Sequence, residues 1–114
     1  MIVSGLTPVE KANSHDTSVT AATDILSATI APSSGRDSNI FHIMVAFSAV
    51  GVFSARVTKS DTTVSINFNS GSDLTANAAY MFDMLVHTGD AVQFRYSATA
   101  TMLVLRVQEI GVAT

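Results

Sequence analysis

The 114-residue sequence predicts an all-β protein, a single antiparallel β-sandwich. Short segments rich in Val, Ile, Phe and Thr recur along the chain, and Gly, Asn, Asp and Ser interrupt them. Such segments at roughly 8 to 12-residue spacing are typical of a sandwich or barrel, here of about eight strands. No long segment has the apolar period of a helix. A single domain of this length hides roughly 65% of its unfolded surface, so it folds without a disulfide or metal.

The first half of the chain contains two expected strands separated by a loop. The first lies within residues 18–30, although its Ala-rich centre also fits a helical turn. Pro, Gly and Ser mark residues 31–39 as the loop. Residues 40–50 then alternate as a strand does. Phe41, Ile43, Val45 and Phe47 share one face, and His42, Met44, Ala46 and Ser48 share the other.

Two more strands are expected in the middle of the chain. One runs from residue 52 to about residue 58 and ends in a polar turn. The next, residues 63–69, places Val64, Ile66 and Phe68 on one face and polar side chains on the other, which is the pattern of a half-buried strand. A Gly- and Ser-rich turn follows it.

Three further segments complete the fold: residues 74–88, 91–97 and 101–110, the first two joined as a hairpin by a Thr-Gly-Asp turn. Their expected core positions alternate with polar ones. These positions are Tyr80, Phe82, Met84, Val86, Val92, Phe94, Tyr96, Leu103, Leu105 and Val107. A jelly roll and an immunoglobulin-like sandwich both fit this layout. The absence of Cys and Trp counts against the immunoglobulin-like alternative.

The second face of these C-terminal strands is unusually apolar. A one-sided sheet would be polar there. Instead it carries large apolar residues beside Arg106, and we expect this set to form an oligomer interface. The set is Met81, Leu85, Met102, Val104 and Arg106. The alternative is ordinary scattered exposure of apolar side chains.

The composition favours association with other protein. The chain is 47% hydrophobic but only 13% charged, against about 25% in typical soluble domains. An oligomer explains this combination, and a monomer with a Ser- and Thr-rich surface is the alternative. A net charge of −3 with six Lys and Arg argues against nucleic acid as a partner. The longest apolar run, residues 40–53, is shorter than the ~20 residues of a membrane span, and the N-terminus lacks the pattern of a secretory signal.

No motif in the sequence indicates a reaction, a cofactor or a metal. His15, His42 and His87 lie far apart in the chain, and Asp90 beside His87 fits a turn residue better than a ligand. No nucleophile elbow, phosphate loop or dinucleotide fingerprint is present, and cysteine is absent. We therefore expect no enzyme. Asp24 and Asp83 fall inside apolar segments and are expected to pair with an arginine. The candidate partners are Arg56, Arg95 and Arg106.

Residues 1–17 are expected to lie outside the domain, which then spans residues 18–114. This N-terminal segment is polar around Glu10 and Lys11 but also contains apolar residues that a docking arm could bury, namely Ile2, Val3, Leu6 and Val9. A disordered leader and an arm that docks on a neighbouring subunit are both consistent with it.

Phe82, Val86, Gly89, Asp90 and Val92 form a spaced motif near the C-terminus, and the apolar segment MLVLRV follows it as the last strand. This layout resembles the end of the tumour necrosis factor and complement-type globular head superfamily. The same layout, over about the last 90 residues, is similar to small jelly-roll structural proteins of tailed bacteriophages. The resemblance implies a jelly roll that assembles as a homotrimer, and it implies a partner among other virion proteins.

The sequence thus leads to one expected function and one alternative. We expect a non-enzymatic structural protein of a virus particle, a capsid decoration, spike or fibre-associated protein, assembled in the host cytoplasm and located in the virion. It would have no membrane or nucleic-acid partner and no cofactor. The alternative is a ligand-binding module of lectin-like or receptor-binding type. The sequence offers few aromatic residues outside core positions for a sugar site.

Overall fold

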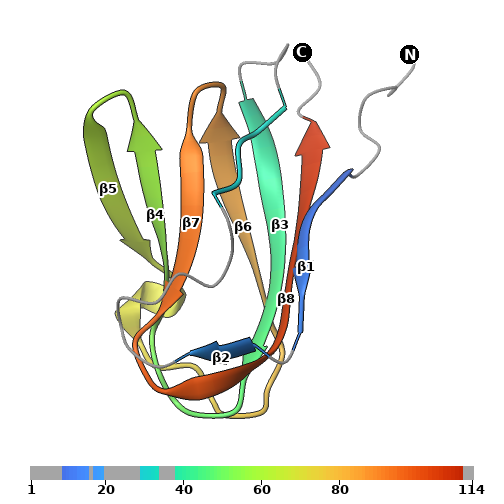
Figure 1. Ribbon diagram of the computed structural model, residues 1–114, viewed down its shortest axis with the longest axis vertical. Coiled ribbons are helices and arrows are strands. Elements are labelled where there is room, and N and C mark those ends of the chain that lie inside the picture. The colour runs from blue at the N-terminus through green and yellow to red at the C-terminus, as the bar shows by residue number, and fades with distance from the viewer. Residues whose placement is uncertain (1–8, 16, 20–28, 34–37, 112–114) are drawn as a thin grey trace.

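The computed structural model describes residues 9–15, 17–19, 29–33 and 38–111 of the chain (Figure 1). These residues form eight strands and one short 3-10 turn. The elements are β1 (Val9–Ser14), β2 (Thr17–Val19), β3 (Ser38–Phe47), β4 (Phe53–Lys59), β5 (Thr62–Asn67), η1 (Asn69–Gly71), β6 (Tyr80–His87), β7 (Ala91–Tyr96) and β8 (Ala100–Gly111). The expected all-β fold is confirmed.

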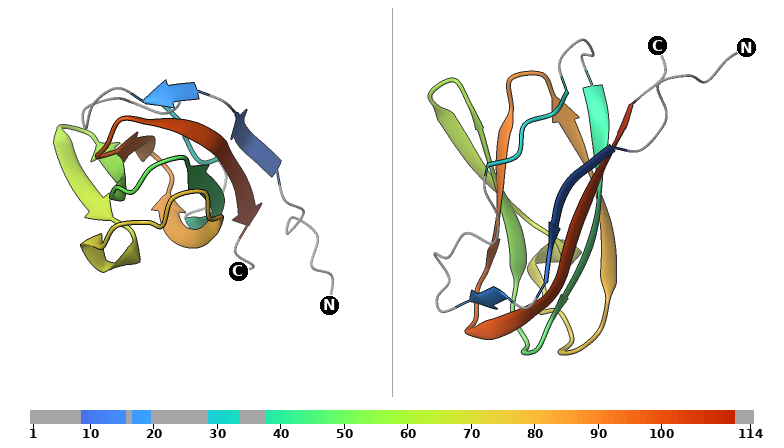
Figure 2. Two further views of the ribbon diagram at one scale, coloured as in Figure 1. Left: turned by 90° about the horizontal axis from the view of Figure 1, so that it is seen from below. Right: turned by 45° about the vertical axis from the view of Figure 1, so that its right-hand side comes forward.

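The strands form two antiparallel sheets, which we call sheet A and sheet B. Sheet A has the order β1-β8-β3-β6, and β2 also pairs with β8. Sheet B has the order β5-β4-β7, and Ile30 forms an isolated bridge with Val92 of β7. The two views of Figure 2 show the sheets as two curved layers of a sandwich. Consecutive strands therefore cross repeatedly from one layer to the other.

Most strand boundaries agree with the sequence prediction. Strands β3, β4, β7 and β8 each lie within two or three residues of the expected positions. The expected strand at residues 74–88 is shorter, because β6 begins only at Tyr80 and Leu74 makes a single bridge to Gly51. Of the segment 18–30, the end of β2 and Ile30 are seen, and residues 20–28 lie outside the described residues.

The core lies between the inward faces of the two sheets and is rich in aromatic rings. Phe41, Ile43, Val45 and Phe47 are all buried, as their alternation predicts. The ring of Phe47 stacks on Tyr96 with centroids 3.6 Å apart. Gly51 is needed beside this pair, because a Cβ atom there would lie 2.9 Å from the Tyr96 ring. Inward alternation in both sheets thus builds one continuous core.

Strand β5 differs from the prediction of a half-buried strand. All six of its residues are exposed, with Val64 53% and Ile66 40% exposed, and only the following Phe68 is buried. Val64 pairs with Val57, and Ile66 pairs with the buried Ala55, so both point towards the interior side of sheet B. The face was predicted correctly, but β5 is the last strand of its sheet, and its inward side chains are not covered.

The expected C-terminal hairpin is also not formed. Strand β6 pairs with β3 in sheet A, whereas β7 pairs with β4 in sheet B. The turn between them therefore links the two layers and not two neighbouring strands. Gly89 adopts φ +95° there, as the Gly-Asp signal predicts, because glycine tolerates this backbone conformation. A local turn signal fixes the turn but not the sheet to which each strand belongs.

The N-terminal segment contributes a strand to sheet A. Residues Val9–Ser14 pair antiparallel with β8 of the same chain, with one register shift between Glu10 and Ala12. The leader and docking-arm alternatives both concern residues 1–17, of which residues 1–8 and 16 lie outside the described residues. Strand β1, within the described part of this segment, is an edge strand of sheet A, which also contains β3 and β6.

Candidate functional site

The outward face of sheet A is the first candidate site. Strands β6, β3 and β8 lie side by side, so their outward side chains form rows across the sheet. Leu85, Ile40 and Ile110 make one row, and Asp83, His42 and Gln108 make the next. Met81, Met44 and Arg106 form the third, and Ala46 pairs with Val104 in the fourth. The polar second row therefore lies between a fully apolar row and a row of two methionines and Arg106.

Exposure is greatest at the β6 side of this face. Met81 and Leu85 are each 57% exposed, the largest values among the exposed large hydrophobic residues of the described chain. Ile40 and Met44 beside them are half-buried. Two large apolar side chains exposed on one strand are unfavourable in water. Covering them with another surface would therefore lower the free energy of the system.

A small open pocket of about 130 Å³ lies on the same face. His42, Met44, Met81, Arg106 and Gln108 line it. Typical small-molecule sites are roughly 300–1,000 Å³, so this pocket fits a single protruding side chain better than a cofactor. The mixed lining of two thioethers, an amide, an imidazole and a guanidinium suits a side chain from another protein.

The structure separates the five residues predicted for the interface. Met81, Leu85, Val104 and Arg106 all lie on the outward face, the last two half-buried. Met102 does not: it is fully buried in the core. The pairing of β3 with β8 shifts register between Ala46 and Phe47, which oppose Val104 and Met102. This irregularity adds one residue to β8 and reverses the side-chain alternation beyond it, which corrects the sequence-based placement of Met102.

The carboxylate of Asp83 has a different partner from the one expected. His42 Nδ1 lies 2.5 Å from Asp83 Oδ1 across the β3–β6 pair, and the Asp83 side chain is 66% exposed. Asp83 is thus paired with a histidine and not with one of the three predicted arginines. Arg106 pairs instead with Glu10 on β1 at 3.1 Å, and Arg56 and Arg95 lie on β4 and β7 of sheet B. Asp83 thus lies on the solvent face and is not buried. Asp24, the other aspartate of this prediction, lies outside the described residues.

The His87 to Asp90 segment is a turn that is stabilised by hydrogen bonds between its own residues. Asp90 is buried, and its Oδ2 accepts a 2.8 Å hydrogen bond from the backbone N–H of His87. The Asp90 backbone N–H in turn donates to the His87 carbonyl at 3.0 Å. His87 Nδ1 lies 3.1 Å from Ser38 Oγ on β3. The interpretation of Asp90 as a turn residue is confirmed.

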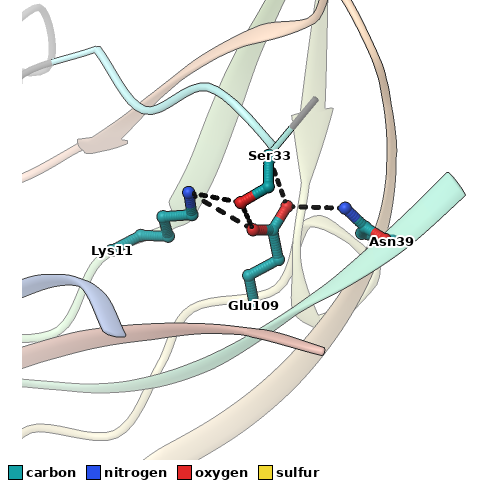
Figure 3. A network of polar contacts seen from close by, with 4 residues as sticks. All are labelled: Lys11, Ser33, Asn39 and Glu109. Atoms are coloured by element: carbon teal, nitrogen blue, oxygen red, sulfur yellow. Dashed lines mark hydrogen bonds and ion pairs between the residues drawn. The ribbon is translucent and has the colours of Figure 1, made fainter. Parts of the chain in front are cut away.

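A buried polar network at Glu109 is the second candidate site (Figure 3). Glu109 is 4% exposed because it lies at an inward position of β8, two residues beyond Val107. Its Oε2 accepts hydrogen bonds from the Ser33 N–H at 2.7 Å and from Asn39 Nδ2 at 2.8 Å. Its Oε1 accepts from Ser33 Oγ at 2.5 Å and lies 3.3 Å from Lys11 Nζ. The sequence analysis did not predict this site. Glu109 continues the alternation of the buried Leu105 and Val107, and this pattern could have indicated that it is buried.

The electrostatics of this network favour an ionised carboxylate. Burial by itself raises the pKa of Glu109, but the hydrogen bonds from Ser33, Asn39 and Lys11 together outweigh it and lower the pKa below its ordinary value. Each of these bonds is made to the charged form. The network ties β1, the segment before β3, and β3 itself to β8.

The geometry of this network is structural and not that of an activated serine. Lys11 Nζ donates to Ser33 Oγ at 2.9 Å, a pairing that could in principle generate a nucleophile. Here, however, the Ser33 hydroxyl and N–H both donate to Glu109, and a carboxylate with a lowered pKa is a weak base. The Ser33 N–H is thereby occupied and does not offer an oxyanion donor.

Within the residues that the structure describes, no three His, Cys, Asp or Glu side chains come together as a metal site built from these residue types would require. No helix in the described part of the chain is long and apolar enough to cross a membrane.

Comparison with protein-family models, with curated proteins and with solved structures gives no match to this chain.

Proposed function

We propose that this protein is a non-enzymatic structural protein that assembles with copies of itself through the outward face of sheet A. The observation that carries the proposal is the exposure of Met81 and Leu85, 57% each, on one strand of a sheet whose outward face also carries Ile40, Met44 and Ile110. Exposed apolar side chains gathered on one face are a common feature of sites that contact other proteins. The interface residues are Met81, Leu85, Val104 and Arg106.

The fold proposed for this role is a jelly roll. Eight strands numbered along a jelly-roll chain form sheets of order 1-8-3-6 and 2-7-4-5. Sheet A runs β1-β8-β3-β6, and the bridge of Ile30 to β7 gives the second sheet an order of Ile30, β7, β4, β5. This order supports the jelly roll if β1 and β2 together count as the first strand.

The finer role rests on the resemblance of the C-terminal strands to small structural proteins of tailed bacteriophages. On that basis the assembly is a homotrimer, and its place is the virion, as a capsid decoration, spike or fibre-associated protein. The low charge content of 13% supports a protein that covers part of its surface with other chains.

The oligomer mass tests the proposal. Light scattering on the purified protein should give three chains per particle, and the double substitution Met81→Lys and Leu85→Lys should give one. Val50→Lys is the matched control, because Val50 is also exposed, at 53%, but lies in the β3–β4 connection. A wild-type monomer, or a double variant that keeps the native mass, would contradict the proposed interface.

A further inference from the structure

Two methionines and a histidine line the small pocket on the outward face of sheet A. Met44 on β3 pairs directly with Met81 on β6, and His42 precedes Met44 by two residues on the same face of β3. All three side chains line the pocket of about 130 Å³, together with Gln108 and Arg106 of β8. The strand register therefore gathers two thioethers and one imidazole at one pocket.

The spacing of these side chains lets them reach one ion. Directly opposite residues of an antiparallel pair have Cβ atoms about 4.5–5.5 Å apart, and residues two apart on one strand lie roughly 7 Å apart. Methionine is long and unbranched, so its sulfur can adjust its position over such distances. Met81 is 57% exposed and Met44 is half-buried. The thioether of Met81 therefore has room to turn towards Met44 and His42.

Asp83 prepares His42 to act as a ligand. Its Oδ1 lies 2.5 Å from His42 Nδ1 across the β3–β6 pair. An ionised carboxylate accepts hydrogen bonds and donates none, so Nδ1 carries the proton and the lone pair of the neutral ring is on Nε2. Histidines that bind metals commonly have such a carboxylate partner, which fixes the tautomer and the orientation of the ring. His42 Nε2 is therefore the nitrogen available to an ion.

The donor set selects a soft, singly charged ion. Thioethers favour copper(I), whereas carboxylates, carbonyls and water favour Mg²⁺, Ca²⁺ and Mn²⁺. The guanidinium of Arg106 pairs with Glu10 at 3.1 Å, and its remaining repulsion is smaller for a single charge than for a double one. We infer that Met44, Met81 and His42 bind copper(I) through their two sulfurs and the imidazole Nε2. The inference does not depend on the assembly proposed above.

This site differs from the apolar row beside it and from a site made of His, Asp and Glu. The neighbouring row consists of Leu85, Ile40 and Ile110, which offer no donor to a metal. Among the described residues, no three His, Cys, Asp or Glu side chains come together. A copper(I) site here needs only one of them, because methionine supplies the other two donors.

Silver(I) provides the test, because it is a soft singly charged ion like copper(I) and is stable in air. Silver nitrate is added to the full-length protein in chloride-free buffer, and the methionine methyl groups are followed by proton–carbon NMR. The signals of Met44 and Met81 should shift until one ion is bound per chain. Those of Met84 and Met102 should stay in place, because both are buried in the core. The ring nitrogen signal of His42 that shifts should be that of Nε2.

Leucine variants separate the ligands from the apolar surface. Met81→Leu and Met44→Leu keep the size and apolar character of the side chain. They should leave the circular dichroism spectrum and the oligomer mass unchanged, but weaken copper(I) binding by roughly tenfold or more. The affinity is measured without oxygen, in competition with a coloured copper(I) chelator. Met84→Leu is the matched control on the same strand as Met81 and should bind copper(I) as the wild type does.

Asp83→Asn tests the positioning of the imidazole. It should weaken copper(I) binding by roughly 10 to 100-fold, whereas His87→Gln, at another exposed histidine of β6, should not. The inference is wrong if silver(I) shifts neither Met44 nor Met81, or if Met81→Leu binds copper(I) as tightly as the wild type. Displacement of silver(I) by an equal concentration of Zn²⁺ would also overturn it, because two thioethers should reject that ion.

Discussion

Glu109 Oε2 and Asn39 Nδ2 lie 2.8 Å apart, at one end of the core where β8 and β3 pair. This bond joins those from Ser33 and the contact with Lys11, so one carboxylate fastens three separate segments of the chain to β8. A buried carboxylate of this kind stabilises the fold only while it is charged and fully bonded.

The pH dependence of stability should reveal this carboxylate. The pKa of Glu109 is lowered in the folded state, so the stability it contributes is present above the pKa of the unfolded chain and is lost as pH falls through the folded pKa. Glu109→Gln should reduce the free energy of unfolding by about 2 kcal/mol at pH 7. Urea unfolding at pH 7 and near pH 3 should show this difference shrinking in acid.

The control for Glu109 is the exposed glutamate of the neighbouring ion pair. Glu10→Gln removes a contact with Arg106 that is open to solvent on both sides, so it should change the unfolding free energy by less than about 1 kcal/mol. Equal losses for the two variants would mean that the buried network contributes no more to the free energy of unfolding than the exposed ion pair does.

The stability that Tyr96 contributes should fall at alkaline pH, whereas the stability that Glu109 contributes should fall in acid. Its hydroxyl donates to the Ala49 carbonyl at 2.6 Å. Burial, followed by the charges of Asp73 and Tyr80, raises the pKa of Tyr96 to about 12. The stability it contributes is present below the unfolded pKa of about 10 and is lost as pH rises towards the folded value. Ultraviolet titration should show Tyr80 ionising first, because a hydrogen bond with Thr75 lowers the pKa of Tyr80.

Tyr96→Phe is the variant that isolates this effect. It keeps the ring stacked on Phe47 but removes the hydroxyl, so it should cost about 1 kcal/mol at pH 7. The fall in stability between pH 10 and pH 12 should become smaller in this variant. An identical alkaline profile for the variant and the wild type would contradict the assignment.

Alternation along a strand can be read from the sequence, but what lies opposite that strand cannot. The buried faces of Phe41 to Phe47 and of Val92 to Tyr96 follow from their alternation alone. The exposure of Val64 does not, because it depends on where sheet A ends. The partner of Asp83 is equally non-local: His42 faces it only because β3 pairs with β6 in one register. The exposure of Val64 and the partner of Asp83 therefore depend on long-range strand pairing, which the local sequence pattern does not reveal.

The hydrogen bond from the His87 backbone to the Asp90 side chain should contribute measurably to stability. Asp90→Ala removes the acceptor of the His87 N–H at 2.8 Å from a buried position, so it should cost about 1–3 kcal/mol. Asp90→Asn retains a side-chain oxygen and should recover most of that loss. Thermal unfolding of the three proteins checks the order, and an Asn variant as unstable as the Ala variant would show that charge, not the hydrogen bond, matters.

Met102 and Met81 provide the sharpest contrast between the sequence pattern and the structure. Both were expected on one outward face, but Met102 is fully buried whereas Met81 is 57% exposed. Met102→Ala should lower the free energy of unfolding by about 2–5 kcal/mol, because it leaves a cavity in the core. Met81→Ala should change it by about 0.5 kcal/mol or less when unfolding is measured in urea at protein concentrations low enough to keep the chains apart. Equal effects would mean that the register shift near Phe47 does not turn Met102 inwards.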